Sequence, residues 1–247
     1  MRAERQAARR AQEAAARKRR SAIIASAVAV LLVAGAVAFI GVRSRDKGPA
    51  VAAAAPTASA AAAAGPCTYN PAGDASREVT PPPSTPTATG DVAVTATTDQ
   101  GVVAWSLLTQ KAPCASNSMI SLARQHFYDG TPCHRLTTSG IFVLQCGDPT
   151  GEGTGGPGYQ FAEENLEGAT YPRGTVAMAK SSAPGSTGSQ FFLVYKDTDL
   201  PPEYTPVGKI TKGLDVLDKI AKAGSKPAGD GAPELKTTIT TFTTDAG

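Results

Sequence analysis

The stretch that decides the fold mixes charged and amide side chains with large apolar ones: Cys133-His134-Arg135-Leu136-Thr137-Thr138-Ser139-Gly140-Ile141-Phe142-Val143-Leu144-Gln145-Cys146-Gly147-Asp148. Its centre, Ser139-Gly140, is typical of a two-residue turn between two paired strands. A strand that only packs in a core has little use for an Arg and a Gln among Phe, Leu and Val. We therefore expect this hairpin to carry a surface that binds an apolar ring and also hydrogen-bonds to an amide.

The two-residue turn predicts a register for the hairpin. Pairing about its centre places Cys133 opposite Cys146 and puts Arg135 on the same face as Phe142. The same register turns Gln145 to the other face. If Gln145 belongs to the same site as Arg135, the hairpin needs a bulge or a longer loop.

Short apolar or alternating runs continue along the C-terminal part of the chain. Strands are expected at 91–98, 102–108, 175–180, 190–195, 205–210 and 237–243, and helices at 115–127 and 214–221. Many short strands with only two helices indicate an all-β fold, a closed β-barrel. A glycine-rich stretch at 148–159 contains a G-x-G-x-x-G pattern, but no helix follows to receive a phosphate, so we interpret it as a surface loop.

An apolar run near the N-terminus is flanked by basic residues. Positions 23–42 hold 20 residues without a charge or a proline, about the length that a helix needs to cross a bilayer core. Eight Lys/Arg precede the run and three follow it. This pattern predicts a basic cytoplasmic segment at 1–21 and a single transmembrane helix at 22–42, with the remainder outside the cell membrane. The alternative is a cleaved signal peptide, which would leave the protein secreted.

Residues 43–90 are rich in Ala, Pro and Thr and predict a disordered or extended linker. It would lead to a C-terminal domain at 91–247. Net charge is +8 over residues 1–47, −1 over 48–90 and −4 over 91–247. The basic balance of the whole chain therefore belongs to its N-terminus, and the mildly acidic domain is not expected to bind nucleic acid.

All four cysteines, Cys67, Cys114, Cys133 and Cys146, follow the apolar run. An even number on the outer side of a membrane indicates disulfides, and four cysteines allow three connectivities. The hairpin register favours Cys133–Cys146 and leaves Cys67–Cys114, while buried free thiols are the alternative. No C-x-x-C pair occurs, so the spacing does not predict a zinc site.

From about residue 91 to 243 the chain resembles the cyclophilin family of peptidyl-prolyl isomerases. The resemblance rests on ordered motifs: His134-Arg135, Phe142 with Gln145 and Gly147-Asp148, Phe161 to Asn165, Met178-Ala179, Gly188 to Phe192, and Val207-Gly208-Lys209. It implies a closed barrel of eight antiparallel strands with a helix over each end. The implied activity is cis/trans exchange of X-Pro peptide bonds, without metal or cofactor.

The resemblance also assigns roles to individual residues. Arg135 matches the catalytic arginine, and Gln145 matches the glutamine that holds the substrate backbone and orients that arginine. The matches to the substrate site are Phe142, Met178, Phe192 and Leu200 for the proline pocket, Ala179, Lys180 and Gln190 for the adjoining groove, and Tyr204 for a wall.

Three positions depart from the family pattern. Asp199 stands where many members carry Trp, Tyr204 where they carry His, and Lys180 where they carry Asn. Asp199 puts binding of cyclosporin-type ligands in doubt more than catalysis. We expect a monomeric isomerase that acts on proline-containing unfolded or exported polypeptides. The competing hypothesis is a non-catalytic proline-binding or scaffold module that is tethered to the membrane.

Overall fold

The computed structural model describes residues 65–246, which belong to one compact unit. The segments expected to be cytoplasmic and transmembrane, and the first part of the expected linker, lie outside the described residues. Between residues 65 and 246, no helix has the length and apolar character needed to cross a bilayer.

The predicted strands and helices are confirmed, with boundaries shifted by up to three residues. The strands are β1 (Asn70–Pro71), β2 (Val92–Thr98), β3 (Gly101–Leu107), β4 (Thr131–Pro132), β5 (Arg135–Thr137), β6 (Val143–Cys146), β7 (Tyr159–Gln160), β8 (Thr175–Met178), β9 (Phe191–Val194), β10 (Pro206–Lys212), β11 (Ser225–Lys226), β12 (Asp230–Pro233) and β13 (Thr238–Thr244). The helices are α2 (Pro113–Arg124) and α3 (Leu214–Ala223). Two-residue strands such as β1, β4, β7 and β11 are too short to carry the alternation that reveals a strand in sequence.

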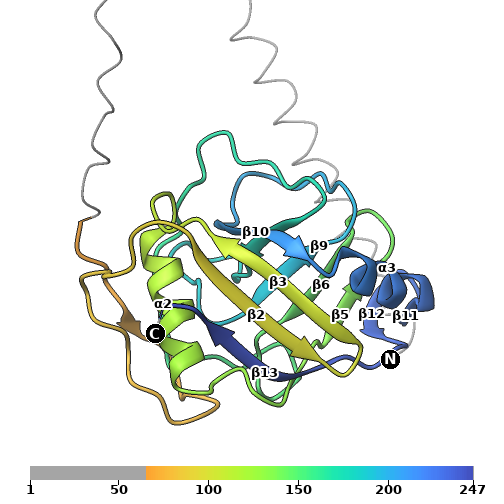
Figure 1. Ribbon diagram of the computed structural model, residues 1–247, viewed down its shortest axis with the longest axis horizontal. Helices are drawn as coiled ribbons and strands as arrows, with labels where there is room; N and C mark the ends of the chain where they lie inside the picture. Colours follow the sequence, from red (N-terminus) through yellow and green to blue (C-terminus); the bar gives the residue numbers. More distant parts are fainter. Residues whose placement is uncertain (1–64, 247) are drawn as a thin grey trace, which may run out of the picture. The chain divides into compact units, whose positions relative to one another are not determined.

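The expected all-β fold with a curled antiparallel sheet and two helices is confirmed, but the number of strands differs from the expected eight. Within residues 65–246, eleven strands pair antiparallel in the order β11-β12-β5-β6-β9-β8-β10-β3-β2-β13-β4, and β1 pairs separately with β7. Only two residues separate β4, at one edge of the sheet, from β5 in its interior. The sheet must therefore curl until that edge approaches β5, which gives an all-β half-barrel (Figure 1).

Aromatic side chains fill the inside of the curled sheet. Trp105, Tyr128, Phe191 and Phe242 are fully buried, and the ring centroids of Tyr128 and Phe242 lie 4.4 Å apart. Helix α2 packs beside β13, and α3 lies at the other end, beside β12 and β3 (Figure 1). This core makes the sheet a rigid support for the side chains on its opposite face.

Residues 65–90 correct the predicted linker, because they pack against the domain as an ordered arm. Strand β1 pairs with β7, and the side chain of Arg77 donates hydrogen bonds to the backbone carbonyls of His126, Phe127 and Asp129. The Tyr69 ring lies edge-on to Tyr159 at 5.4 Å. The composition of this segment suggested an extended spacer. The arm is ordered by contacts with residues distant in sequence, and composition does not reveal such contacts.

Both favoured disulfides are confirmed. Cys67–Cys114 joins the arm to the start of α2, with a sequence separation of 47 and a Cα–Cα distance of 5.4 Å. Cys133–Cys146 joins the link between β4 and β5 to the end of β6, with a Cα–Cα distance of 4.0 Å. The second bridge fixes the base of the hairpin that carries Arg135.

Candidate functional site

Four residues form a row across adjacent strands on the outer face of the sheet. Arg135 on β5 stands opposite Gln145 on β6, Gln145 opposite Phe192 on β9, and Phe192 opposite Ala177 on β8. Directly opposed residues in an antiparallel ladder project from the same face. The row therefore sets a guanidinium, an amide and an aromatic ring side by side.

The register that creates this row differs by one residue from the two-residue-turn prediction, which is wrong. Five residues, 138–142, connect β5 to β6, and Thr137 Oγ1 accepts a hydrogen bond from the Val143 backbone N–H at 3.0 Å. The longer loop places Arg135 opposite Gln145. This is the alternative that the sequence required if both side chains belong to one site.

The Arg135 guanidinium is held by two partners. Its Nε and Nη2 donate to Asp230 Oδ1 and Oδ2, both at 2.7 Å, and its Nη1 donates to Gln145 Oε1 at 3.3 Å. The hydrogen bonds between Arg135 and Asp230 raise the pKa of the guanidinium and lower the pKa of the carboxyl. Both groups are therefore charged at neutral pH.

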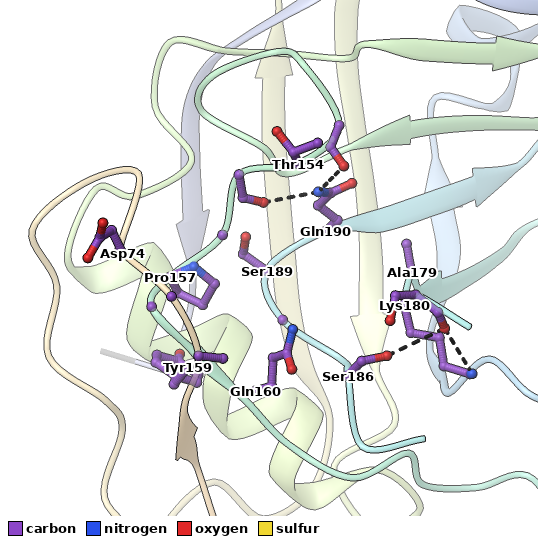
Figure 2. Close-up of a pocket in the computed structure, with 18 of the residues that line it drawn as sticks. Asp74, Thr154, Pro157, Tyr159, Gln160, Ala179, Lys180, Ser186, Ser189 and Gln190 are labelled. Atoms are coloured by element: carbon purple, nitrogen blue, oxygen red, sulfur yellow. Dashed lines mark hydrogen bonds between the residues drawn. The ribbon is translucent and has the colours of Figure 1, made fainter. Parts of the chain in front are cut away.

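A second hydrogen-bonded chain runs from Gln145 toward the glycine-rich loop. Gln145 Nε2 donates to Gln190 Oε1 at 2.9 Å, and Gln190 Nε2 donates to the carbonyls of Gly153 and Gly155, each at 3.0 Å. Figure 2 shows Gln190 reaching these two carbonyls. The amide of Gln145 is thus oriented on one side by Arg135 and on the other by Gln190.

The glycine-rich loop is itself organised by one buried carboxylate. Burial opposes ionisation of Asp148, but hydrogen bonds from the backbone N–H groups of Gly155, Thr150 and Gly153, and from the Thr150 hydroxyl, lower its pKa overall. A Cβ on Gly155 would overlap this carboxylate, so the close approach requires glycine. The glycines that suggested a nucleotide motif therefore wrap a side chain of the protein.

An apolar cluster, separate from the main core, lies beside the row. Its buried members are Val143, Tyr171, Ala177, Phe192 and Val194, and its half-buried members are Ile141, Ala169, Ala179, Leu200 and Tyr204. The Tyr204 ring stands edge-on to Phe192 at 5.6 Å, and the Tyr171 hydroxyl donates to the Tyr204 carbonyl at 2.8 Å. The half-buried members leave apolar surface that an apolar ring of a ligand could cover.

The structure does not bring Phe142 and Met178 to this cluster, contrary to their assignment to the proline pocket. The Phe142 ring packs against the other side of the sheet, where it lies 6.1 Å from the Tyr195 ring and 4.2 Å from Lys196 Nζ. Met178 is 1% exposed and belongs to the main core, because it follows Ala177 on a strand whose side chains alternate.

A hollow of about 500 Å³ adjoins the row on the side away from Asp230. Gln145, Gln190, Ala179 and Lys180 contribute to its wall, together with the glycine-rich loop and residues 72–74 of the arm. Figure 2 shows Lys180 and the arm residue Asp74 on opposite sides of it. The arm therefore extends the surface next to the row beyond the curled sheet itself.

Sequence reasoning named eight side chains that the structure gathers here: Arg135, Gln145, Ala179, Lys180, Gln190, Phe192, Leu200 and Tyr204. It missed Ile141, Val143, Tyr171 and Asp230. Counting alternate residues back from Gln145 would have found Val143 and Ile141. Within residues 65–246, no group of three or more His, Cys, Asp or Glu side chains is placed to hold a metal ion.

Sequence comparison decides the family. The profile of the cyclophilin type peptidyl-prolyl cis-trans isomerase/CLD family matches residues 93–244, more than half of the chain. The chain belongs to the cyclophilin family. A protein named probable peptidyl-prolyl cis-trans isomerase B from Mycobacterium tuberculosis is 47% identical over 197 residues, and the protein of the same name from Mycobacterium leprae is 46% identical over 197 residues. These alignments cover 72% of this chain and 64% and 66% of the relatives, so the chain spans about two thirds of their length.

Solved cyclophilin structures support the same fold. A cyclophilin type peptidyl-prolyl cis-trans isomerase from Cryptosporidium parvum superposes with a TM-score of 0.58 at 27% identity, covering 64% of this chain and 99% of that one. A second structure of that protein, in the presence of the dipeptide Ala-Pro, superposes with a TM-score of 0.56 at 28% identity, covering 63% of this chain and 99% of that one. The arm at 65–90 lies outside the family match at 93–244.

Proposed function

We propose that this cyclophilin is a peptidyl-prolyl cis-trans isomerase that accelerates the exchange of X-Pro peptide bonds. The observation that carries the proposal is the row in which Arg135 and Gln145 stand beside Phe192 and the half-buried apolar cluster. Membership of the cyclophilin family and the names of the mycobacterial relatives support the same activity.

The chemistry requires no nucleophile, metal or cofactor. Rotation about a peptide bond faces a barrier of about 18–20 kcal/mol because of its partial double-bond character. At X-Pro bonds the two isomers are close in energy but exchange over tens to hundreds of seconds. A catalyst therefore needs to bind the twisted amide better than either planar form. Twisting localises the lone pair on the prolyl nitrogen, which becomes a hydrogen-bond acceptor.

Each part of the site fits one requirement of that transition state. The apolar cluster with Phe192, Leu200 and Tyr204 would hold the prolyl ring. Arg135 would donate to the prolyl nitrogen, because its guanidinium stays charged and its donors are rigidly directed. Gln145 would hold the substrate backbone and keep Arg135 in place. Gln190, Ala179 and Lys180 would contact the residues that precede or follow the proline.

Exchange measured on an Ala-Pro peptide with the purified full-length chain tests this function. We expect the cis/trans exchange rate to rise in proportion to the protein concentration, and Arg135→Ala at the same concentration serves as the matched control. A non-catalytic proline-binding module would instead shift the peptide's NMR signals without changing the exchange rate. That result would replace the isomerase by the scaffold hypothesis.

We also propose where the enzyme works: anchored in the cell membrane by residues 22–42, with the isomerase domain outside the cytoplasm, assisting the folding of exported or cell-envelope proteins. The two disulfides support this placement, because disulfides persist in oxidising compartments. Protease added to intact cells should digest the domain and spare a short N-terminal fragment. A domain that is digested only after lysis would contradict the orientation, and a chain released into the medium would favour the cleaved signal peptide.

A further inference from the structure

A second residue, Asp230, holds Arg135 from a distant part of the chain. Asp230 opens β12, which pairs with β5 so that Asp230 stands opposite Thr137, two residues from Arg135 on the same face. Its two carboxylate oxygens accept parallel hydrogen bonds from Nε and Nη2 of Arg135, with both N–O distances at 2.7 Å. Two parallel bonds of this kind fix the plane of a guanidinium as well as its position.

The remaining donors of Arg135 can be counted. A guanidinium carries five N–H donors. Asp230 takes two of them and Gln145 takes a third, which leaves two for a substrate. Because both anchors lie on the sheet, the free donors keep a fixed direction when no substrate is bound.

We propose that Asp230 is a positioning residue for isomerisation: it holds the Arg135 guanidinium in the orientation that donates to the twisted prolyl amide. This inference rests on the catalytic role proposed above for Arg135. Asp230 itself need not touch the substrate, since its carboxylate is already paired with Arg135. Fixing a donor before the reaction spares the cost of orienting it in the transition state.

The same domain contains a matched pair outside the site. Arg173 donates from Nη1 and Nη2 to Asp218 on α3 at 2.7 and 2.8 Å. The side chains of this second pair are 37% and 53% exposed, and those of Arg135 and Asp230 are 40% and 56% exposed. Each pair forms a fork, in which two guanidinium nitrogens donate to the two oxygens of one carboxylate. The two forks should contribute equally little to the free energy of unfolding, since exposed ion pairs are weak. Asp218→Asn is therefore a control for the loss of one exposed Arg–Asp fork.

The experiment compares Asp230→Asn with Asp218→Asn in the full-length chain. Asparagine keeps one acceptor for Arg135 but turns an amide NH₂ toward its second donor, which breaks the fork. We expect Asp230→Asn to lower kcat for an Ala-Pro peptide by roughly 10- to 100-fold with KM within about twofold, because the lost interaction acts mainly in the transition state. Asp218→Asn should retain the rate of the unaltered protein, and Asp230→Glu should recover much of it.

Two further measurements separate positioning from a general structural effect. In an Arg135→Ala background, Asp230→Asn should change the residual rate by less than about twofold, because nothing is left to position. The NMR signal of the Arg135 Nε–H should be slow to exchange in the unaltered protein and in Asp218→Asn, but not in Asp230→Asn.

Three results would overturn the inference. The first is a kcat that is unchanged or raised in Asp230→Asn, since a raised rate would mean that the carboxylate competes with the substrate for Arg135. The second is a full additional loss in the Arg135→Ala background. The third is equal rates for the unaltered protein and Arg135→Ala, which would also remove the catalytic role proposed for Arg135. The first two outcomes leave that role standing, so the two proposals fail separately.

Discussion

Replacing Arg135 by alanine should separate catalysis from stability. The substitution removes two hydrogen bonds to Asp230 and one to Gln145. The ion pair is 40% and 56% exposed, so its loss should cost at most about 1 kcal/mol of the free energy of unfolding. Losing a charged donor aimed at the reacting amide typically costs about 2.7–4 kcal/mol of transition-state stabilisation. That corresponds to a fall of roughly 10²–10³-fold in turnover.

The assay pairs NMR exchange on an Ala-Pro peptide with denaturant unfolding of the same samples. We expect a large loss of exchange rate in Arg135→Ala at nearly unchanged unfolding free energy. Arg135→Lys should recover only part of the rate, because a flexible ammonium lacks the planar fork that Asp230 and Gln145 hold. Equal exchange rates would remove Arg135 from the mechanism. A loss of several kcal/mol of stability would show that the pair is structural and that the lower rate reflects unfolding.

Three more substitutions test other parts of the structure. Replacing Cys67 and Cys114 by serine opens a loop that the bridge closes across a sequence separation of 47, and denaturant unfolding should show a loss of about 4 kcal/mol; an unchanged unfolding free energy would mean that the arm is held without the bridge. Because the pKa of Asp148 is lowered on folding from its usual 3.8, its ionised carboxylate stabilises the protein above about pH 4, and that stability is lost as the pH falls through the lowered pKa. Asp148→Asn should therefore be less stable by about 2–3 kcal/mol at pH 7, with a difference that shrinks in acid; a gap that is constant with pH would contradict the sign. Phe192→Ala should weaken binding and turnover of an Ala-Pro peptide, whereas Phe142→Ala should leave peptide binding unchanged; equal kinetic losses would return Phe142 to the pocket.

The parts of the fold visible in sequence are those with a repeating pattern. Strand β2 alternates buried and less buried residues over Val92–Thr98, and helix α3 places Leu217 and Ile220 on its buried side. The periodic spacing of apolar residues in such segments allows them to be predicted from sequence. The arm at 65–90 has no such pattern, and its order depends on Cys67 and on Arg77 reaching carbonyls about fifty residues away. The sequence of the arm alone does not indicate which distant residues it contacts, so its order could not be predicted.

The site was visible where chemistry is unusual and hidden where it depends on register. Arg135 and Gln145 stand out because polar side chains are rare within apolar strands. Phe142 could be placed only by knowing the loop length, since a shift of one residue moves every side chain to the other face. Asp230 had no signal, because it meets Arg135 across 95 residues of sequence and is one of many acidic residues in the domain.

Loop length therefore determines what this hairpin can do. A two-residue turn would set Arg135 on the face of Phe142 and send Gln145 into the core, leaving the guanidinium without its amide partner. The five-residue loop is instead closed by a hydrogen bond from the Val143 N–H to Thr137 Oγ1. It pairs Arg135 with Gln145 and aligns both with Phe192. The disulfide at the base and the β12 strand beside β5 then hold this register from both sides. A catalyst that works by orienting one donor depends on that rigidity more than on any reactive group.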